Sequence, residues 1–278
     1  MRYFNLRSPW VIVVCVLVLG AGRATAQTTS VASMDDDDAV LDAANPDYRV
    51  INLPTTARLP VHKANFELTH RFNGNFRGGD FARLAGDLFG LDNGATIGLE
   101  YRYAVLRHVQ AAIYRVNVDK LIQLHGKYDM FRQGGALPVA ASVLVSVEGA
   151  DNFRERYTPA LGVALSRTLN GKVALYATPT WVHNSAPLIG ETRDTFFVGV
   201  GGRIRLLPAM YVVAEVSPRL GGYEQGPPAF GVGIEGRKGG HMFQLNFNNG
   251  QGSTFGQIAR GGNPKALYMG FNIARKFF

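Results

Sequence analysis

The sequence predicts an all-β protein, an antiparallel transmembrane β-barrel of about twelve strands with up-and-down topology. Three observations support this prediction. Apolar and polar residues alternate along most of the chain, as in strands whose two faces meet different surroundings. Hydrophobic residues make up 46% and charged residues only 18% of the 278 residues, so much apolar surface is accompanied by few charges. Short turns also alternate with longer loops, which is typical of outer-membrane barrels.

The first residues have the pattern of a secretory signal peptide. Arg2 and Arg7 precede an apolar run at 10–19, and the small-residue motif Ala24-Thr25-Ala26 follows. The run is shorter than the ~20 residues that a membrane-spanning helix needs. We therefore expect residues 1–26 to be removed on export together with Cys15, the only cysteine, which excludes a disulfide scaffold.

Residues 27–52 are expected to form a flexible acidic tether ahead of the barrel domain, 53–278. The run Asp35-Asp36-Asp37-Asp38 lies among Thr, Ser and Ala without a periodic apolar face, which is typical of a solvated segment. An Asp-rich calcium loop would space its ligands and include a turning glycine, so the run does not predict a metal site. A periplasmic partner that docks on this tether is one hypothesis for its role.

Twelve segments from residue 63 onward fit strands of period two. In the first, Ala64, Phe66 and Leu68 alternate with polar neighbours. The clearest segments are 63–72, 95–103, 122–130, 139–148, 196–206, 243–248 and 267–277, and weaker ones are 108–117, 159–169, 172–182, 209–218 and 228–236. Such lengths exceed the usual six residues or so of soluble strands and suit tilted strands that cross a bilayer.

The connections between these segments are sorted by length. Short turns follow every second strand, and Asn170-Gly171 is the clearest hairpin signal among them. The longer connections are 73–93, 149–158, 183–194, 218–228 and 249–265, and the link near Asn117 is a short exception. An even strand number places both termini at the short-turn end, which is periplasmic in bacterial outer-membrane barrels.

Two of the long connections contain helical patterns. Residues 81–89 suggest a short helix, and the segment 255–260 lies in the last long connection. Either could fold inward and narrow the lumen. We expect both to be ordinary loops outside the barrel, because long connections of outer-membrane barrels are usually external.

The polar face of the strands carries charged side chains, which a membrane barrel directs into its lumen. Two interpretations stay open, a paired network that fills the barrel and a charged path for small solutes or ions. Width does not decide between them, because about twelve strands lie between the eight that side chains fill and the sixteen that leave a channel. The candidate lumen-lining residues are Glu67, Arg71, Glu100, Arg102, Lys127, Glu148, Arg203, Arg205, Glu215 and Glu235.

No motif predicts catalysis, a cofactor or a metal. The six histidines lack the spacing of a zinc site. A hydrolase in the barrel wall would be sought at His183-Asn184-Ser185, but neighbouring residues in a strand point to opposite faces. The formal net charge is +8, yet the basic residues are scattered singly, so a nucleic-acid partner is not expected.

The chain ends in Phe277-Phe278 at the close of the last strand. A terminal aromatic residue resembles the signal that the bacterial outer-membrane assembly machinery reads. Phe277, rather than Phe278, has the apolar parity of this strand, so the register differs by one from the usual pattern. The expected partners are therefore this machinery and the lipid of the outer membrane.

Several motifs resemble a family of uncharacterised Gram-negative outer-membrane β-barrel proteins, a domain of unknown function. The most specific is Gly239-Gly240-His241-Met242-Phe243-Gln244-Leu245, followed by Asn249-Gly250-Gln251-Gly252. Further motifs are Leu53-Pro54-Thr55-Thr56 with Leu59-Pro60, Thr69-His70-Arg71-Phe72, Asp87-Leu88-Phe89-Gly90-Leu91-Asp92, Pro179-Thr180-Trp181-Val182-His183, Gly199-Val200-Gly201-Gly202-Arg203 and Gly270-Phe271-Asn272-Ile273-Ala274-Arg275. The resemblance covers 53–278 and implies a fold and an outer-membrane location, without an activity.

Three functional hypotheses follow from the sequence. The first is a narrow outer-membrane channel or transporter for small solutes. The second is a plugged barrel without conductance that has a structural or partner-docking role. The third, a minor alternative, is a hydrolase embedded in the barrel wall; we expect that the protein is not an enzyme.

Overall fold

The computed structural model describes residues 42–185, 193–223 and 225–278, so the predicted signal peptide and the acidic run at 35–38 lie outside the described residues. Strands form a single antiparallel sheet. They are β1 (Ala64–Asn75), β2 (Ala95–Leu106), β3 (Val109–Val116), β4 (Leu121–Phe131), β5 (Ala140–Gly149), β6 (Glu155–Leu169), β7 (Val173–Val182), β8 (Thr195–Leu207), β9 (Met210–Ser217), β10 (Arg219–Gly221), β11 (Ala229–Lys238), β12 (His241–Asn248) and β13 (Tyr268–Phe277).

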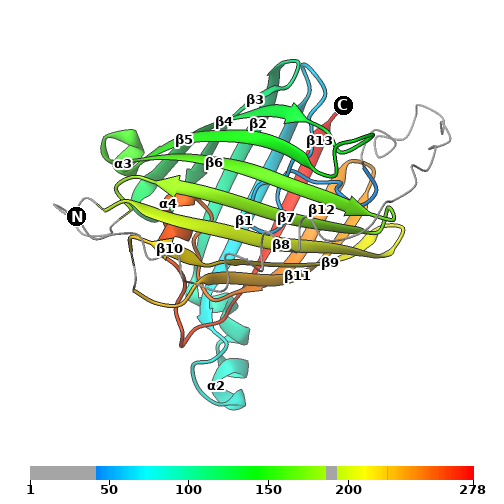
Figure 1. Cartoon of the computed structure of the whole chain (residues 1–278). Coiled ribbons are helices and arrows are strands. Elements are labelled where there is room, and N and C mark those ends of the chain that lie inside the picture. The colour runs from blue at the N-terminus through cyan, green and yellow to red at the C-terminus, as the bar shows by residue number, and fades with distance from the viewer. Residues whose placement is uncertain (1–41, 186–192, 224) are drawn as a thin grey trace.

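The sheet closes on itself into a barrel (Figure 1). The first strand pairs with the last in a register that runs from Ala64 opposite Phe277 to Arg71 opposite Gly270. The short β10 continues β9 and pairs with β8, so the two form one wall strand. The wall therefore has twelve antiparallel strands in up-and-down order, and each predicted segment coincides with one of them. The predicted fold class is confirmed.

The wall is apolar outside and charged inside, the reverse of a water-soluble sheet protein. In β2, Leu99 and Tyr101 are 43% and 48% exposed, whereas Glu100 and Arg102, which alternate with them, are buried. The same alternation recurs in β9, where Val212 and Val216 are exposed. An apolar outer face of this kind suits lipid. The helices among the described residues are all too short or too polar to cross a membrane.

Connections are sorted between the two ends of the barrel largely as the sequence predicts, but the connection after β5, 150–154, is shorter than predicted and the turn after β4, 132–139, is longer. The short turns, among them 107–108, 170–172 and 239–240, gather at one end, where β1 begins and β13 ends. The long connections gather at the other end together with the short links 117–120 and 150–154, and the connections at this end contain the short helices. These helices are α2 (Phe81–Gly86), η1 (Leu88–Asn93), η2 (Val118–Lys120), α3 (Ala150–Phe153) and α4 (Phe255–Ala259). We call the two ends the short-turn end and the long-loop end.

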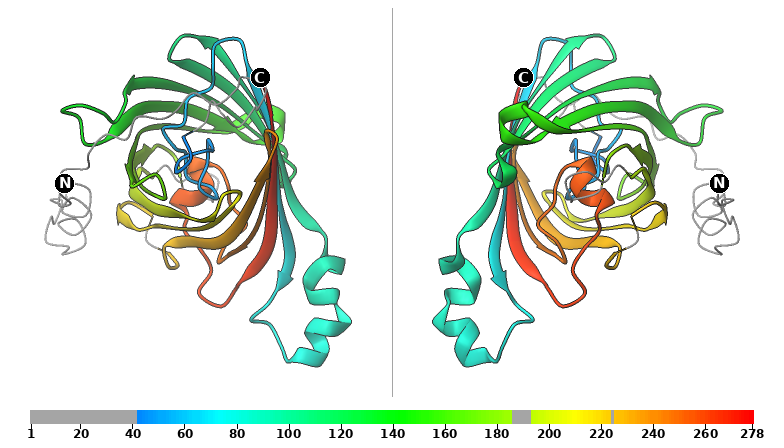
Figure 2. Two further views of the ribbon diagram at one scale, coloured as in Figure 1. Left: turned by 90° about the vertical axis from the view of Figure 1, so that its right-hand side faces the viewer. Right: turned by 90° about the vertical axis from the view of Figure 1, so that its left-hand side faces the viewer.

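The prediction of a flexible tether that extends to residue 52 is wrong for its described part, 42–52. Residues 44–59 form a compact segment inside the barrel, here called the lumen hairpin (Figure 2). The Val50 amide donates to the Leu53 carbonyl (2.8 Å) and the Thr55 amide to the Tyr48 carbonyl (2.9 Å). The tip of the hairpin is Ile51-Asn52. This irregular segment has no helical or strand period in its sequence, because its contacts come from the wall around it.

The segment 255–260 also differs from its prediction as an external loop. It contains α4, whose Phe255 and Ile258 are buried inside the long-loop end of the barrel. Thr254 begins this helix with a capping box, in which its hydroxyl accepts from the Gln257 amide. The other helical connection agrees with its prediction, because every residue of α2 is at least partly exposed and outside the lumen.

Candidate functional site: the closed lumen

Nine of the ten predicted lumen-lining residues are buried and face the interior, on seven different strands. Arg205 is the exception. Its guanidinium lies at the short-turn rim and donates to the Pro208 carbonyl at 2.9 and 3.2 Å. The interior that the other nine surround is occupied by the lumen hairpin and by α4, which together form the candidate site.

Inward side chains of the wall satisfy the backbone carbonyls of the hairpin. The Arg203 guanidinium donates to the Arg49 carbonyl at 2.8 Å, and the Gln244 amide to the Val50 carbonyl at 2.7 Å. The Lys127 ammonium donates to the Thr55 carbonyl at 3.2 Å. Lys276 donates to the Pro46 carbonyl, Asn272 to the Ile51 carbonyl and Lys127 also to the Ala57 carbonyl. Just before the hairpin, Tyr211 donates to the Ala43 carbonyl. Because buried backbone groups are costly without partners, these contacts let an irregular segment stay inside the barrel.

One carboxylate holds the tip of the hairpin. Glu215 on β9 accepts from the backbone amides of Ile51 (3.0 Å), Asn52 (2.9 Å) and Leu53 (3.1 Å). It also accepts from the Asn52 side-chain amide at 2.9 Å. Hydrogen bonds from several amides to one charged acceptor are stronger than neutral ones, so Glu215 is the main polar anchor of the tip.

Two of the three charged residues of the hairpin, Asp47 and Arg49, meet opposite charges on the wall. The Asp47 carboxylate lies 2.9 Å from the Arg237 guanidinium and 3.8 Å from the Lys276 ammonium. Arg49 forms an ion pair with Glu100, and its Nε lies 3.5 Å from Glu67. All of these groups are buried, and removal of one partner from such a pair leaves an uncompensated charge that costs about 3–5 kcal/mol.

Positive charges control the titration of Asp47 at the base of the hairpin. Burial would raise the pKa of its carboxyl, but Lys276, Arg237 and Arg203 outweigh burial and lower the pKa to about 2. The Tyr48 amide donates to the same carboxyl group at 2.8 Å and acts in the same direction. Asp47 is therefore ionised at neutral pH.

Other buried pairs connect wall residues with each other. Arg203 lies 2.9 Å from Glu235, and Arg102 lies 2.8 Å from Glu100. Lys127 is also paired, at 3.2 Å from Asp129. Six of the predicted charges thus take part in buried ion pairs around the hairpin: Glu67, Glu100, Arg102, Lys127, Arg203 and Glu235.

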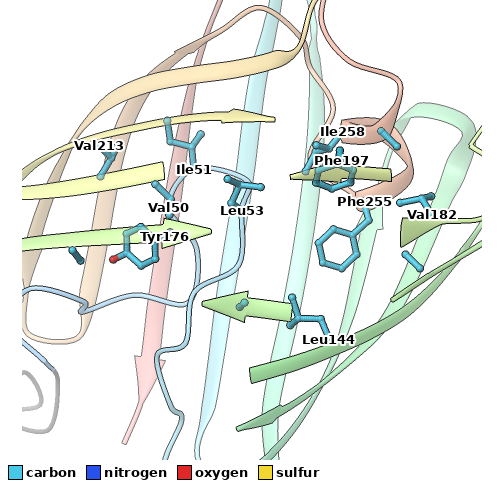
Figure 3. Packing of buried hydrophobic residues seen from close by; sticks show 14 of the residues in the cluster. Val50, Ile51, Leu53, Leu144, Tyr176, Val182, Phe197, Val213, Phe255 and Ile258 are labelled. Carbon is cyan, nitrogen blue, oxygen red and sulfur yellow. The ribbon is translucent and has the colours of Figure 1, made fainter. Parts of the chain in front are cut away.

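Apolar contacts join the tip of the hairpin to α4 (Figure 3). Val50, Ile51 and Leu53 belong to one buried cluster with Phe255 and Ile258. The wall contributes, among others, Leu144, Tyr176, Val182, Phe197 and Val213 to the same cluster. The lumen is therefore charged beside β1, β2 and β11–β13, and apolar beside much of β5–β9.

Glycine makes room for this contact. A Cβ atom at Gly199 on β8 would collide with the side chain of Leu53, and one at Gly231 would lie 3.1 Å from Cδ1 of Ile51. Gly199, Gly201 and Gly231 thus face the hairpin, and their missing side chains let it approach the wall.

Helix α4 closes the long-loop end above the hairpin. The Gly256 amide donates to the Glu148 carboxylate on β5 at 3.4 Å, and a Cβ at Gly256 would collide with that carboxylate. Arg49 of the hairpin donates to the Ser253 carbonyl at 3.2 Å just before the helix. Glu148 therefore holds α4 rather than the hairpin, and the two closures touch each other.

Little space is left between the two closures. A cavity of about 10 Å³ lies between the hairpin tip at Asn52 and the α4 region at Ile258, with Phe230 and Asn248 also in its lining. That volume holds about one water molecule. Within the described residues, the hairpin and α4 thus occupy the lumen.

Among the described residues, His183 and Ser185 bond to different partners. His183 Nδ1 lies 2.6 Å from the Asp194 carboxylate, which also accepts from the Trp181 indole at 3.3 Å. Ser185 is buried, and its hydroxyl bonds to the Thr195 hydroxyl (2.7 Å) and the Arg193 carbonyl rather than to His183. The described residues also contain no cluster of three or more His, Cys, Asp or Glu suited to a metal.

The sequence analysis missed part of the network. Alternation could have identified three of the missed residues. Asp129 and Arg237 share the parity of the predicted residues Lys127 and Glu235 on their strands, and Lys276 lies on the polar face of β13. Asp47 and Arg49 carry no such signal, because they lie in the hairpin and outside any strand.

Replacement of Glu215 by glutamine should loosen the hairpin tip. The substitution removes a charge and offers an amide group to three amide donors, so hydrogen exchange of the 51–53 amides should accelerate at least about tenfold. Glu148→Gln is the matched control, because Glu148 contacts α4 instead. Unchanged protection of these amides in the Glu215→Gln variant would contradict the anchoring role.

Acid should loosen the base of the hairpin. Because the pKa of Asp47 is lowered, its ion pairs stabilise the hairpin fully above the ordinary carboxyl value of 3.8 and are lost as pH falls toward 2. Hydrogen exchange of the hairpin, corrected for intrinsic rates, should therefore increase between pH 4 and pH 2. An Asp47→Asn variant should lack this pH dependence, and an equal response of both proteins would refute the assignment.

Comparison with known proteins agrees with this architecture. A family model described as a membrane bound beta barrel domain (DUF5777) matches residues 46–277. Similar solved structures include the NanC porin (7% identity, TM-score 0.48, 77% of this chain and 99% of that chain) and the KdgM porin in complex with disordered oligogalacturonate (4%, 0.47, 78% and 98%). The Acinetobacter baumannii outer membrane protein Omp33 is another (11%, 0.44, 78% and 98%). No curated protein matches the sequence. The chain belongs to the membrane bound beta barrel domain family DUF5777.

Proposed function

We propose that the protein is an outer-membrane channel for small polar solutes that its own lumen hairpin closes at rest. The observation that carries this proposal is the way the hairpin is attached. Ala43, directly before the hairpin, is held by Tyr211 near the short-turn end, and Lys63, just after it, pairs with Ala104 at the same end. Because it enters and leaves by one opening, the hairpin can withdraw without threading through the barrel.

The wall that remains after withdrawal suits small polar solutes. Its inward side chains are small along β6, where Ala160, Gly162 and Ala164 alternate, and they are charged along β1 and β2. Basic and acidic side chains both contribute, so the lining favours neither sign strongly. Barrels of this strand number are wider than the eight-stranded ones that side chains fill.

Planar-bilayer conductance tests the proposal. The mature chain, 27–278, should rarely open, whereas a chain that lacks residues 27–60 should open at least about ten times as often. Deletion of 27–41 alone is the matched control, because it keeps the hairpin and should stay silent. Heat-modifiable migration on a gel shows in each case that the barrel is folded.

A permanently plugged structural barrel is the second candidate. The buried ion pairs of Asp47 and Arg49 favour it, because withdrawal of the hairpin separates them. The two candidates differ in the intact chain. Rare openings of the chain 27–278, which become more frequent when 27–60 are deleted or when 253–260 are replaced by a Gly-Ser linker to remove α4, support the channel. An intact chain that never opens at any applied voltage, beside folded deletion variants that conduct, would exclude the channel and leave the plugged barrel.

We propose further that the short-turn end and both termini face the periplasm. The short turns and long loops support this orientation. In intact cells, a membrane-impermeant maleimide should label an Arg154→Cys variant at the long-loop end and spare a Lys172→Cys variant until the outer membrane is permeabilised. The opposite labelling would refute the orientation. Cys15, the only native cysteine, lies in the predicted signal peptide.

We infer that the protein acts by transport or closure and not as an enzyme. The position of Ser185 supports this inference, because its hydroxyl is buried and bonded to Thr195 and not to His183. A nucleophile needs an adjacent base within hydrogen-bond reach. Lipid hydrolysis by the purified protein that Ser185→Ala abolishes would overturn the inference.

A further inference from the structure

The loop between β1 and β2, residues 76–94, exposes large apolar side chains. Phe81 is 74% exposed, Leu88 54%, Leu91 45% and Phe89 39%. Isolated exposed apolar residues are ordinary, but a contiguous group of them marks an interaction surface. We call these residues the apolar face of the β1–β2 loop.

The loop has a defined shape that presents this face. Asp80 caps α2 by accepting from the Arg83 amide at 3.0 Å. At the base of the loop, the Phe76 amide donates to the Leu267 carbonyl at 2.8 Å. Gly74 and Gly90 lie so close that a Cβ on either would collide with the backbone of the other. The apolar face is thus held outward by specific contacts.

The apolar face continues the lipid-facing side of the wall. Phe247 on β12 has the outward parity of Phe243 and Leu245, and the Phe76 ring contacts it edge-on with centroids 5.6 Å apart. Phe76 also stacks on Phe89 at 6.2 Å, and Phe89 meets Phe81 at 5.9 Å. A continuous series of aromatic rings therefore leads from the wall to the loop.

The direction of the loop agrees with these contacts. Both views of Figure 2 show it extending away from the ring of strands instead of across the opening of the barrel. Aromatic residues are enriched where an outer-membrane barrel leaves the hydrocarbon region. An element with apolar residues beside charged ones, here Arg83 and Asp87, is typical of segments that lie in the interface of a bilayer.

We propose that the β1–β2 loop is a membrane anchor that inserts Phe81, Leu88 and Leu91 into the leaflet at the long-loop end. The occupant of the apolar face is lipid, because the face continues a surface that already meets lipid. The proposal is independent of whether the lumen conducts. A second copy of the chain on this face is the competing occupant, which the experiment below distinguishes.

Tryptophan fluorescence in vesicles tests the anchor. Trp181 is the only tryptophan outside the predicted signal peptide, so a Trp181→Phe background is free of other signals. Phe81→Trp and Leu88→Trp are each introduced into it, and the proteins are reconstituted into phosphatidylcholine vesicles with or without brominated acyl chains. The matched controls are Tyr128→Trp on the outer wall and Arg154→Trp in another connection at the long-loop end.

Brominated chains should quench the tryptophan fluorescence of Phe81→Trp and Leu88→Trp at least half as strongly as that of Tyr128→Trp. Aqueous iodide should quench the fluorescence of the same two variants less than that of Arg154→Trp. Strong iodide quenching without bromine quenching would overturn the proposal. Protection from both quenchers that disappears when the protein is diluted in lipid would assign the face to a second copy and overturn it as well. Heat-modifiable migration shows whether each variant has folded. If one variant fails to fold, the other still provides the test.

Discussion

The structure depends on the requirement that buried backbone groups find hydrogen-bond partners. A barrel wall meets this requirement by pairing its strands all the way around, and it can then turn apolar side chains toward lipid. The lumen hairpin is irregular and cannot meet the requirement by itself. Charged and amide side chains of the wall meet it instead: Arg203, Gln244 and Glu215 bind hairpin carbonyls or amides. The polar inner face of the strands follows from this need.

The same need explains what the sequence predicts and what it does not. Alternation identified all twelve wall strands, and the parity of Glu67, Arg71 and Glu235 placed them inside, because each strand repeats the same choice between two faces. The hairpin escaped prediction because its position depends on partners distant in sequence, such as Glu215 and Gln244, which are 164 and 194 residues from Ile51 and Val50. The inward position of α4 was not predicted for the same reason. Its first residues carry a clear capping signal, but no local sequence pattern shows whether a loop lies inside or outside the barrel.

The two closures of the lumen differ in how they are held. The hairpin combines ion pairs, amide contacts to Glu215 and the apolar contact of its tip, whereas α4 is bound through Phe255, Ile258 and the contact of Gly256 with Glu148. Removal of the hairpin would expose apolar side chains of α4 to water. The two closures therefore share one apolar cluster.

The place of the hairpin at the start of the domain constrains the order in which the protein folds. Its contacts span most of the chain: Arg49 and Ser253 are 204 residues apart, and Val50 and Gln244 are 194 apart. Contacts of such high order form only after the later strands exist, although the hairpin itself is synthesised first. Until the seam between β1 and β13 closes, the apolar residues at its tip have no complete binding site. The hairpin can therefore occupy the lumen with all of its contacts only after the wall has been completed in the correct register.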